Sequence, residues 1–136
     1  MTLNEYQKQA MTTCMPSSEN FSYMFLNLVG EVGEFASKVA KAIRKEQCSI
    51  GLEPHIAEQF ECDGDTANNL WQFHGEEERL EELKKEAGDI LWQLSGVCTI
   101  FGWSLEEVAQ MNLDKLSARK KAGTIVGNGD GVIREK

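Results

Sequence analysis

The stretch Gly30-Glu31-Val32-Gly33-Glu34 decides the fold that we expect for this chain. It lies in the middle of a long helical pattern, yet it holds two glycines, and each costs about 1 kcal/mol relative to alanine in a helix interior. Glycine at such a position indicates that something comes close to the backbone. Glu31 and Glu34 are three residues apart, so they occupy neighbouring positions on one helix surface. Two carboxylates this close repel each other unless a cation or a proton lies between them.

A second stretch, Glu86-Ala87-Gly88-Asp89, repeats the pattern of two acids at i and i+3 beside a glycine. Carboxylate oxygens are the ligands that Mg²⁺ prefers in proteins. No histidine or cysteine is near either pair in the sequence, which argues against zinc. Neither histidine has a glutamate three residues before it, as a di-iron helical bundle requires. The sequence therefore predicts that four carboxylates on two helices converge on a metal ion: Glu31, Glu34, Glu86 and Asp89.

The alternative is that these acids form solvated helix faces with lysine partners at i+4, such as Glu34 with Lys38 and Glu81 with Lys85. A single pair of acids favours that interpretation. Two pairs, each beside a glycine and each bordering an apolar stripe, favour the metal site.

Length and composition exclude several classes of protein. The chain has 136 residues, of which 41% are hydrophobic, so we expect one folded domain over residues 1–136. Its net charge of -8 argues against a general nucleic-acid binder. No apolar run approaches the ~18 residues of a membrane span, and no signal peptide is visible. The four cysteines are widely spaced and form no C-x-x-C, which predicts reduced thiols and a cytoplasmic protein.

The periodicity predicts an all-α fold with four helices, over residues 3–15, 19–45, 77–101 and 105–122. Capping boxes at Thr2/Glu5 and Ser104/Glu107 begin the first and the fourth helix. Pro16 ends the first helix, and Ser17-Ser18 offer an N-cap for the second. Gly102 stops the third helix and Gly123 closes the fourth.

The two long helices each show an apolar stripe, which we expect to face the core. The stripe of the second helix consists of Phe21, Phe25, Leu28, Val32, Phe35, Val39 and Ala42, and that of the third consists of Leu80, Leu83, Ala87, Ile90, Leu94, Val97 and Phe101. A polar flank borders each stripe: Asn27, Glu31, Glu34, Lys38 and Lys41 on the second helix, and Glu82, Glu86, Asp89 and Gln93 on the third. In the fourth helix we expect Leu105, Val108, Ala109 and Leu116 to face the core.

Residues 46–78 differ from the rest, because glycines and a proline interrupt any long pattern. Residues 52–60 and 66–73 are candidates for short helices, and the segment is long enough to act as a flap over a site, with Trp71 and Phe73 near a bound base. The tail at 122–136 is rich in turn residues, which is typical of a small hairpin or an arm. A zinc site made of the histidines and cysteines in 46–78 has spacings that match no usual finger.

Asn112, Lys115 and Arg119 share one face of the fourth helix. An amide, an ammonium and a guanidinium suit a triphosphate, since arginine can bind two phosphate oxygens at once. An ordinary charged face near a helix C-terminus, where cations are favoured, explains them equally well.

These motifs, taken in order, resemble the MazG-like nucleoside triphosphate pyrophosphohydrolases. The resemblance lies in Gly30–Glu34, in Glu86–Trp92 and in the N-x-x-K-x-x-x-R pattern of Asn112–Arg119, and it covers the chain except for about residues 46–78. It implies a four-helix bundle with an inserted connection between helices 2 and 3, assembled as a homodimer or homotetramer. It implies hydrolysis of a nucleoside triphosphate, a dNTP or a non-canonical one, to the monophosphate and pyrophosphate.

The resemblance also implies roles for particular residues. Mg²⁺, with Mn²⁺ as a possible substitute, is held by Glu31, Glu34, Glu86 and Asp89, and Glu34 is the candidate for activating water. Substrate contacts come from Lys38, Asn112, Lys115 and Arg119.

Two alternatives stay open. One is a non-catalytic helical module that binds nucleotide or metal, or that only dimerises. The other is a related pyrophosphatase that acts on phosphoribosyl-ATP or dUTP. The acid pairs are separated by 51 residues, 35–85, which is longer than in most members of the family and bears on the choice of base.

Overall fold

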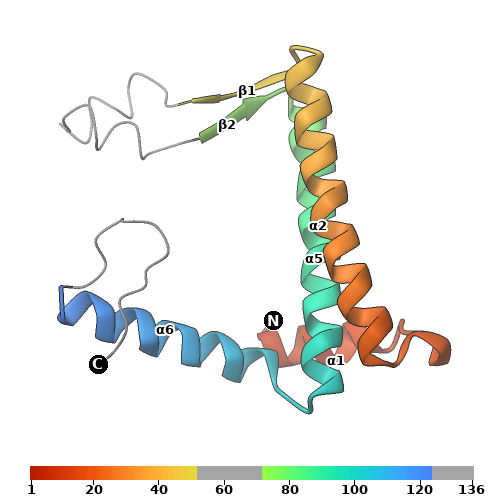
Figure 1. Ribbon diagram of the computed structural model, residues 1–136, viewed down its shortest axis with the longest axis vertical. Helices are drawn as coiled ribbons and strands as arrows, with labels where there is room; N and C mark the ends of the chain where they lie inside the picture. The colour runs from red at the N-terminus through yellow and green to blue at the C-terminus, as the bar shows by residue number, and fades with distance from the viewer. Residues whose placement is uncertain (52–71, 124–136) are drawn as a thin grey trace. The chain divides into compact units, whose positions relative to one another are not determined.

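The computed structural model describes residues 1–51 and 72–123, and it is helical apart from a two-stranded sheet (Figure 1). The elements are α1 (Leu3–Met11), a short 3-10 helix (Pro16–Ser18), α2 (Phe21–Arg44), β1 (Cys48–Gly51), β2 (Gln72–Gly75), α5 (Glu77–Ile100) and α6 (Leu105–Lys121). The prediction of an all-α fold is confirmed. None of the helices in the two described ranges has the length and apolarity needed to cross a membrane.

The helix ends follow local capping chemistry. At α1 the Thr2 hydroxyl accepts a hydrogen bond from the Glu5 amide at 3.0 Å, and the Thr2 amide donates to the Glu5 carboxylate at 2.6 Å. Ser104 Oγ accepts from the amide of Glu107 at 3.3 Å and begins α6. The predicted cap of α2 was wrong: residues 17 and 18 belong to the 3-10 helix, and Asn20 Oδ1 accepts from the Tyr23 amide at 2.8 Å instead.

The sequence did not predict the β-hairpin ladder. Strands β1 and β2 pair antiparallel, with Cys48 opposite Gly75 and Gly51 opposite Gln72. A Cβ at Gly75 would lie 2.8 Å from the Cβ of Cys48, so only glycine fits there. Because β2 includes residues 72 and 73, the helix expected over 66–73 is wrong at its end. The remainder of that segment, the helix expected over 52–60 and the tail from 124 lie outside the described residues.

The chain divides into two units, which we describe separately. The first consists of Met1–Met24 and Leu94–Lys136. The buried apolar side chains of its part up to residue 123 are Ala10, Met24, Cys98 and Leu105. Gly96 makes room for Met24, since a Cβ there would lie 2.3 Å from the Met24 sulfur. Burial raises the pKa of the Cys98 thiol, so that it remains a neutral core residue.

Gln7 ties α1 to the turn before α6 within this first unit. Its amide nitrogen donates to Thr99 Oγ1 and to the carbonyl of Trp103, both at 3.0 Å, and its amide oxygen accepts from the Leu105 amide at 2.7 Å. One side chain thus satisfies backbone groups that the helix end would otherwise leave without partners.

The second unit is Phe25–Gln93, in which the α2 and α5 segments run antiparallel and the hairpin joins their ends (Figure 1). Two side-chain pairs set the register: Asn27 with Gln93 and Lys38 with Glu86. Among the described residues of this unit, the buried apolar ones are Ala42 and Leu83.

The inward face of these helices corrects the sequence prediction. On α5 two residues of the polar flank are buried, with Glu86 8% and Gln93 2% exposed, whereas Asp89 of the same flank is exposed. Leu116 of α6, which was expected to face the core, is exposed in the single chain. Several members of the predicted apolar stripes are exposed as well: Phe21, Phe25, Val32, Leu80, Ala87, Leu94 and Phe101. The periodicity located the apolar faces, but not what the polar flanks contact.

Candidate metal centre

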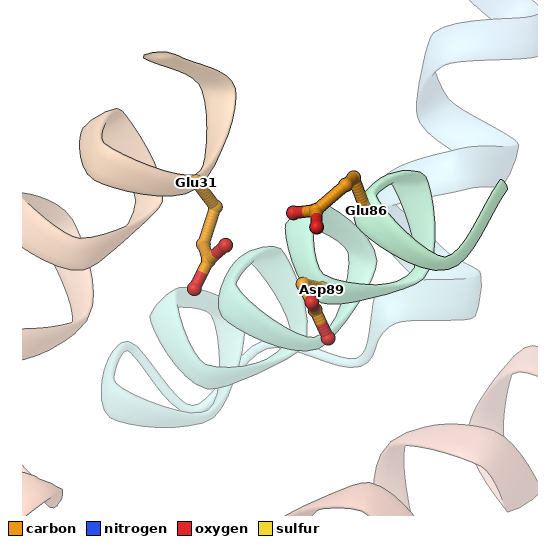
Figure 2. A group of neighbouring side chains, drawn as sticks. All are labelled: Glu31, Glu86 and Asp89. Atoms are coloured by element: carbon orange, nitrogen blue, oxygen red, sulfur yellow. The ribbon is translucent and has the colours of Figure 1, made fainter. Parts of the chain in front are cut away.

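Three carboxylates meet between α2 and α5. Glu31 comes from α2, and Glu86 and Asp89 come from one turn of α5, where their spacing of three places them on one surface (Figure 2). One oxygen from each lies within 4.8 Å of the others. We call this set the acid cluster. The sequence prediction that the two acid pairs face each other is thus met for these three residues.

The electrostatics of the acid cluster favour a cation. The pKa of the Glu31 carboxyl is raised, first by burial and then by the negative charges of Asp89, Glu34 and Glu86. No sulfur or imidazole among the described residues joins the cluster, so its donors are hard oxygens. This donor set fits a divalent cation such as Mg²⁺ better than zinc.

Glu34 lies beside the acid cluster but is not one of the three acids whose oxygens converge. Its side chain is exposed on α2, and its charge and a hydrogen bond both raise the pKa of Glu31. The structure therefore brings three of the four predicted ligands together and leaves the fourth next to them, toward solvent.

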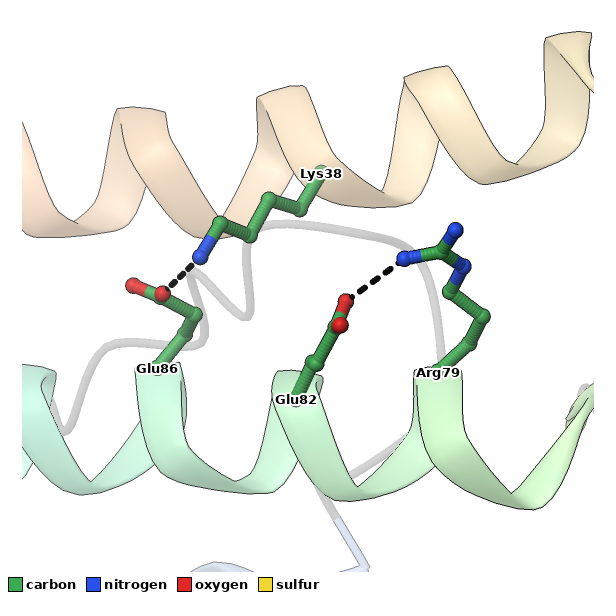
Figure 3. Close-up of polar contacts among 4 residues, drawn as sticks. All are labelled: Lys38, Arg79, Glu82 and Glu86. Carbon is green, nitrogen blue, oxygen red and sulfur yellow. Dashed lines mark hydrogen bonds and ion pairs between the residues drawn. The ribbon is translucent and has the colours of Figure 1, made fainter.

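Lys38 is bound to this centre. Its Nζ donates to Glu86 Oε1 as an ion pair across the two helices (Figure 3). The hydrogen bond to Glu86 is the main reason that the pKa of Lys38 is raised. An ammonium at this position offsets part of the negative charge of the cluster and holds the Glu86 carboxylate in place.

An amide pair closes the other end of the acid cluster, and the sequence did not assign it a role. Asn27 Nδ2 donates to Gln93 Oε1 at 2.6 Å. Asn27 is one turn before Glu31, and Gln93 is one turn after Asp89. Each of these amides is four residues from an acid of the cluster on its own helix, and this spacing is the sequence signal that could have identified the pair.

The helix-interior glycines do not meet the close neighbours that the sequence predicted. A Cβ at Gly33 or Gly88 would contact nothing within 4 Å among the described residues, and one at Gly30 would make an ordinary 3.8 Å contact with Asn27. Within one chain, these glycines leave open surface beside the acid cluster.

Asn112, Lys115 and Arg119 lie on α6, in the first unit. Asn112 and Lys115 line a cavity of about 520 Å³ whose other walls are Trp103, Glu107, Val108 and Met111. Arg119 lies further along the same helix and is half-buried.

The residues of the zinc alternative divide between the described and the undescribed parts. Nε2 of His74 is 2.8 Å from the carbonyl oxygen of Gly51, within the hairpin. Cys48 is a free thiol, whereas His55 and Cys62 lie outside the described residues.

The fold and the acid cluster define a class: an all-α protein with a carboxylate centre suited to a divalent metal. The chain belongs to the MazG nucleotide pyrophosphohydrolase domain family, whose model matches residues 19–124 and so includes both acid pairs and the polar face of α6. Membership supports nucleotide pyrophosphohydrolase activity, and the family is typically metal-dependent.

A relative from a phage is consistent with this assignment. The "Gene 37 protein" of Mycobacterium phage L5 is 32% identical over 114 residues, which are 84% of this chain and 78% of that protein. Its name says nothing of an activity. No solved structure matches the chain.

Proposed function

We propose that this protein is a Mg²⁺-dependent enzyme that hydrolyses nucleoside triphosphates, dNTPs or non-canonical NTPs, to the monophosphate and pyrophosphate. The observation that carries the proposal is the acid cluster of Glu31, Glu86 and Asp89, whose oxygens lie within 4.8 Å of one another in a chain of the MazG family. Mn²⁺ is the expected substitute, because it accepts the same oxygen ligands.

The metal ligands are the three acids of the cluster, with Glu34 as the fourth. When bound, the ion supplies charge neutralisation on the phosphate oxygens. The protein supplies positioning: Glu31 and Asp89 are fixed by facing helices, and Glu86 is held by its burial and by Lys38. Carboxylates held in this way need little reorganisation when substrate arrives.

Glu34 is the residue that we assign to the attacking water. Its exposed side chain lies next to Glu31, so water reaches it while it stays at the edge of the acid cluster. The water oxygen bonds to the α-phosphorus, its proton passes to the Glu34 carboxylate, and the bond from the α-phosphorus to the bridging oxygen breaks. Pyrophosphate then leaves with that oxygen. In this scheme Asn112, Lys115 and Arg119 contact the substrate, as the family resemblance implies.

The test is a panel of dNTPs, dUTP and phosphoribosyl-ATP, with pyrophosphate release measured with Mg²⁺ and with a chelator. We expect release of pyrophosphate and monophosphate only with the metal. Release of orthophosphate, or no turnover of any substrate, would contradict the proposal and leave the non-catalytic module as the better account. Preference for dUTP or phosphoribosyl-ATP would identify one of the related pyrophosphatases.

We also propose that the working form is a homodimer or homotetramer. The single chain exposes many large apolar side chains, more than a stable monomer usually does. Those on α2 are Phe21, Tyr23, Phe25, Leu26, Val29, Val32 and Ile43, and Leu26 is 69% exposed. Burying such a face against a second copy is the common solution for a symmetric assembly.

Leu26→Glu tests this assembly. In a monomer the change is a surface substitution and alters the free energy of unfolding by no more than about 0.5 kcal/mol. In an assembly that buries this face, it lowers the sedimentation coefficient toward that of one chain. A wild-type protein that sediments as an active monomer at micromolar concentration would refute the proposal.

A further inference from the structure

A second, basic site lies next to the acid cluster. The α2 and α5 segments and the start of the hairpin enclose a cavity of about 100 Å³, lined by Lys38, Lys41, Ala42, Gln47, Arg79, Glu82 and Leu83. Three cations thus face one carboxylate, in a chain whose net charge is -8. We call this cavity the basic pocket.

The basic pocket continues the two rows that carry the acid cluster. On α2 the row is Glu31, Glu34, Lys38 and Lys41, and on α5 it is Asp89, Glu86, Glu82 and Arg79. Both rows have steps of three, four and three, so each keeps to one helix surface. Because the helices are antiparallel, the two rows run side by side from the acid cluster toward the hairpin. The rise from Glu31 to Lys38 is ~10.5 Å along the helix, at 1.5 Å per residue.

Lys38 connects the two sites. Its Nζ binds Glu86 of the acid cluster (Figure 3), and the same residue lines the basic pocket. A ligand that extends from the metal ligands past Lys38 therefore enters the basic pocket directly. A polyphosphate chain has this form, with metal-bound oxygens at one end and further anionic groups at the other.

The helix dipole and local ion pairs account for only some of the cations in the basic pocket. Lys41 is in the last turn of α2, where the helix dipole favours a cation. Arg79 is in the first turn of α5, where the dipole disfavours one. Its ion pair with Glu82, at 2.9 Å between Nη1 and Oε2, adds little stability, because the two side chains are 35% and 43% exposed. The described residues give Lys41 no ion pair at all.

We propose that the basic pocket binds the terminal phosphates of the substrate, and the pyrophosphate formed from them, through Lys41 and Arg79. The inference rests on the proposed function and adds the orientation of the bound substrate. The α-phosphorus lies at the acid cluster, the β- and γ-phosphates extend toward the hairpin, and the nucleoside extends the other way. The Arg79 guanidinium suits two phosphate oxygens and exchanges its Glu82 partner for them.

The test measures binding of inorganic pyrophosphate by calorimetry, without metal or turnover, to the full chain. Lys41→Gln and Arg79→Gln are each expected to weaken binding about 10-fold, as for loss of a charged hydrogen bond. Glu82→Gln is expected to strengthen it, because it removes the one carboxylate of the pocket lining. Lys84→Gln is the matched control, since Lys84 is an exposed α5 cation that pairs with Glu81 outside the pocket.

The outcomes separate this inference from the proposed function. If wild type does not bind pyrophosphate, or if all four variants bind it like wild type, the basic pocket is not a phosphate site. If the variants shift binding as expected but no triphosphate is hydrolysed, the pocket stands and the proposed function fails. If triphosphates are hydrolysed while Lys41→Gln and Arg79→Gln leave KM and product inhibition unchanged, the function stands and the pocket assignment is wrong. Recovery of binding in Lys41→Arg shows that the charge matters rather than the fold.

Discussion

The acid cluster and the basic pocket are built on the same two helices with the same residue spacing, yet they carry opposite charges. In the acid cluster, Glu86 is buried and the pKa of Glu31 is raised by burial and by its acidic neighbours, whereas Asp89 is exposed. In the basic pocket, the side chains of Lys38 and Arg79 are 42% and 35% exposed. Crowded carboxylates favour a bound cation, whereas solvent-facing cations are accessible to an arriving anion. One pair of helices thus carries carboxylates suited to a metal ion and, beside them, cations suited to phosphate groups.

The largest effect is expected at the acid cluster. Glu86→Gln and Asp89→Asn should each lower kcat/KM at least ~10²-fold, because a lost ligand removes stabilisation of transition-state charge. Pyrophosphate release at limiting Mg²⁺ measures this loss. Glu81→Gln, an exposed acid on the same helix, is the control. Near-normal rates in both variants would remove these residues from the site.

A smaller effect is expected in the basic pocket. Lys41→Gln should lower kcat/KM for triphosphates about 10-fold and weaken inhibition by pyrophosphate by a similar factor, since one charged contact is lost. Steady-state kinetics with added pyrophosphate give both numbers. A loss as large as that of Asp89→Asn would mean that Lys41 acts in the chemistry, and the contrast between the two sites would fail.

The Asn27–Gln93 amide pair and the basic pocket should differ in how much they contribute to the free energy of unfolding. Asn27→Ala removes the donor to buried Gln93 and should lower the free energy of unfolding by about 1–3 kcal/mol. Lys41→Gln and Arg79→Gln should lower it much less, because substitutions of surface residues have small effects on stability. Urea unfolding of the three variants checks this order. Equal destabilisation would show that the basic pocket is part of the structural support rather than a binding site.

Local features of this chain were predictable from the sequence, and pairings between distant segments were not. The capping residues Thr2 and Ser104 and the stop at Gly102 depend on neighbours within a few residues, and the structure has them as expected. The hairpin was missed, because the partners Cys48 and Gly75 are far apart in the chain and each strand has only four residues.

The candidate site shows the same division. Glu86 and Asp89 were found because a spacing of three on a helix fixes a common surface. Arg79 was not assigned, since its position beside Lys41 follows from the antiparallel register of α2 and α5. Of the predicted apolar stripes, Ala42 and Leu83 are buried as expected, whereas others such as Phe25 and Leu94 are exposed in the single chain, because periodicity does not say whether the same chain or another copy covers a surface.

The central claim is that Glu31, Glu86 and Asp89 bind one divalent cation. The most direct measurement is Mn²⁺ binding, followed by the paramagnetic resonance signal of the free ion, for wild type and for Glu31→Gln, Asp89→Asn and the control Glu81→Gln. We expect wild type and the control to bind Mn²⁺ with the same affinity, and the two cluster variants to bind it at least ~10-fold more weakly. Loss of a residue that only supports a metal ligand already lowers metal affinity about 10-fold, and loss of a ligand itself should lower it at least as much. Equal Mn²⁺ affinity in all four proteins would contradict the account.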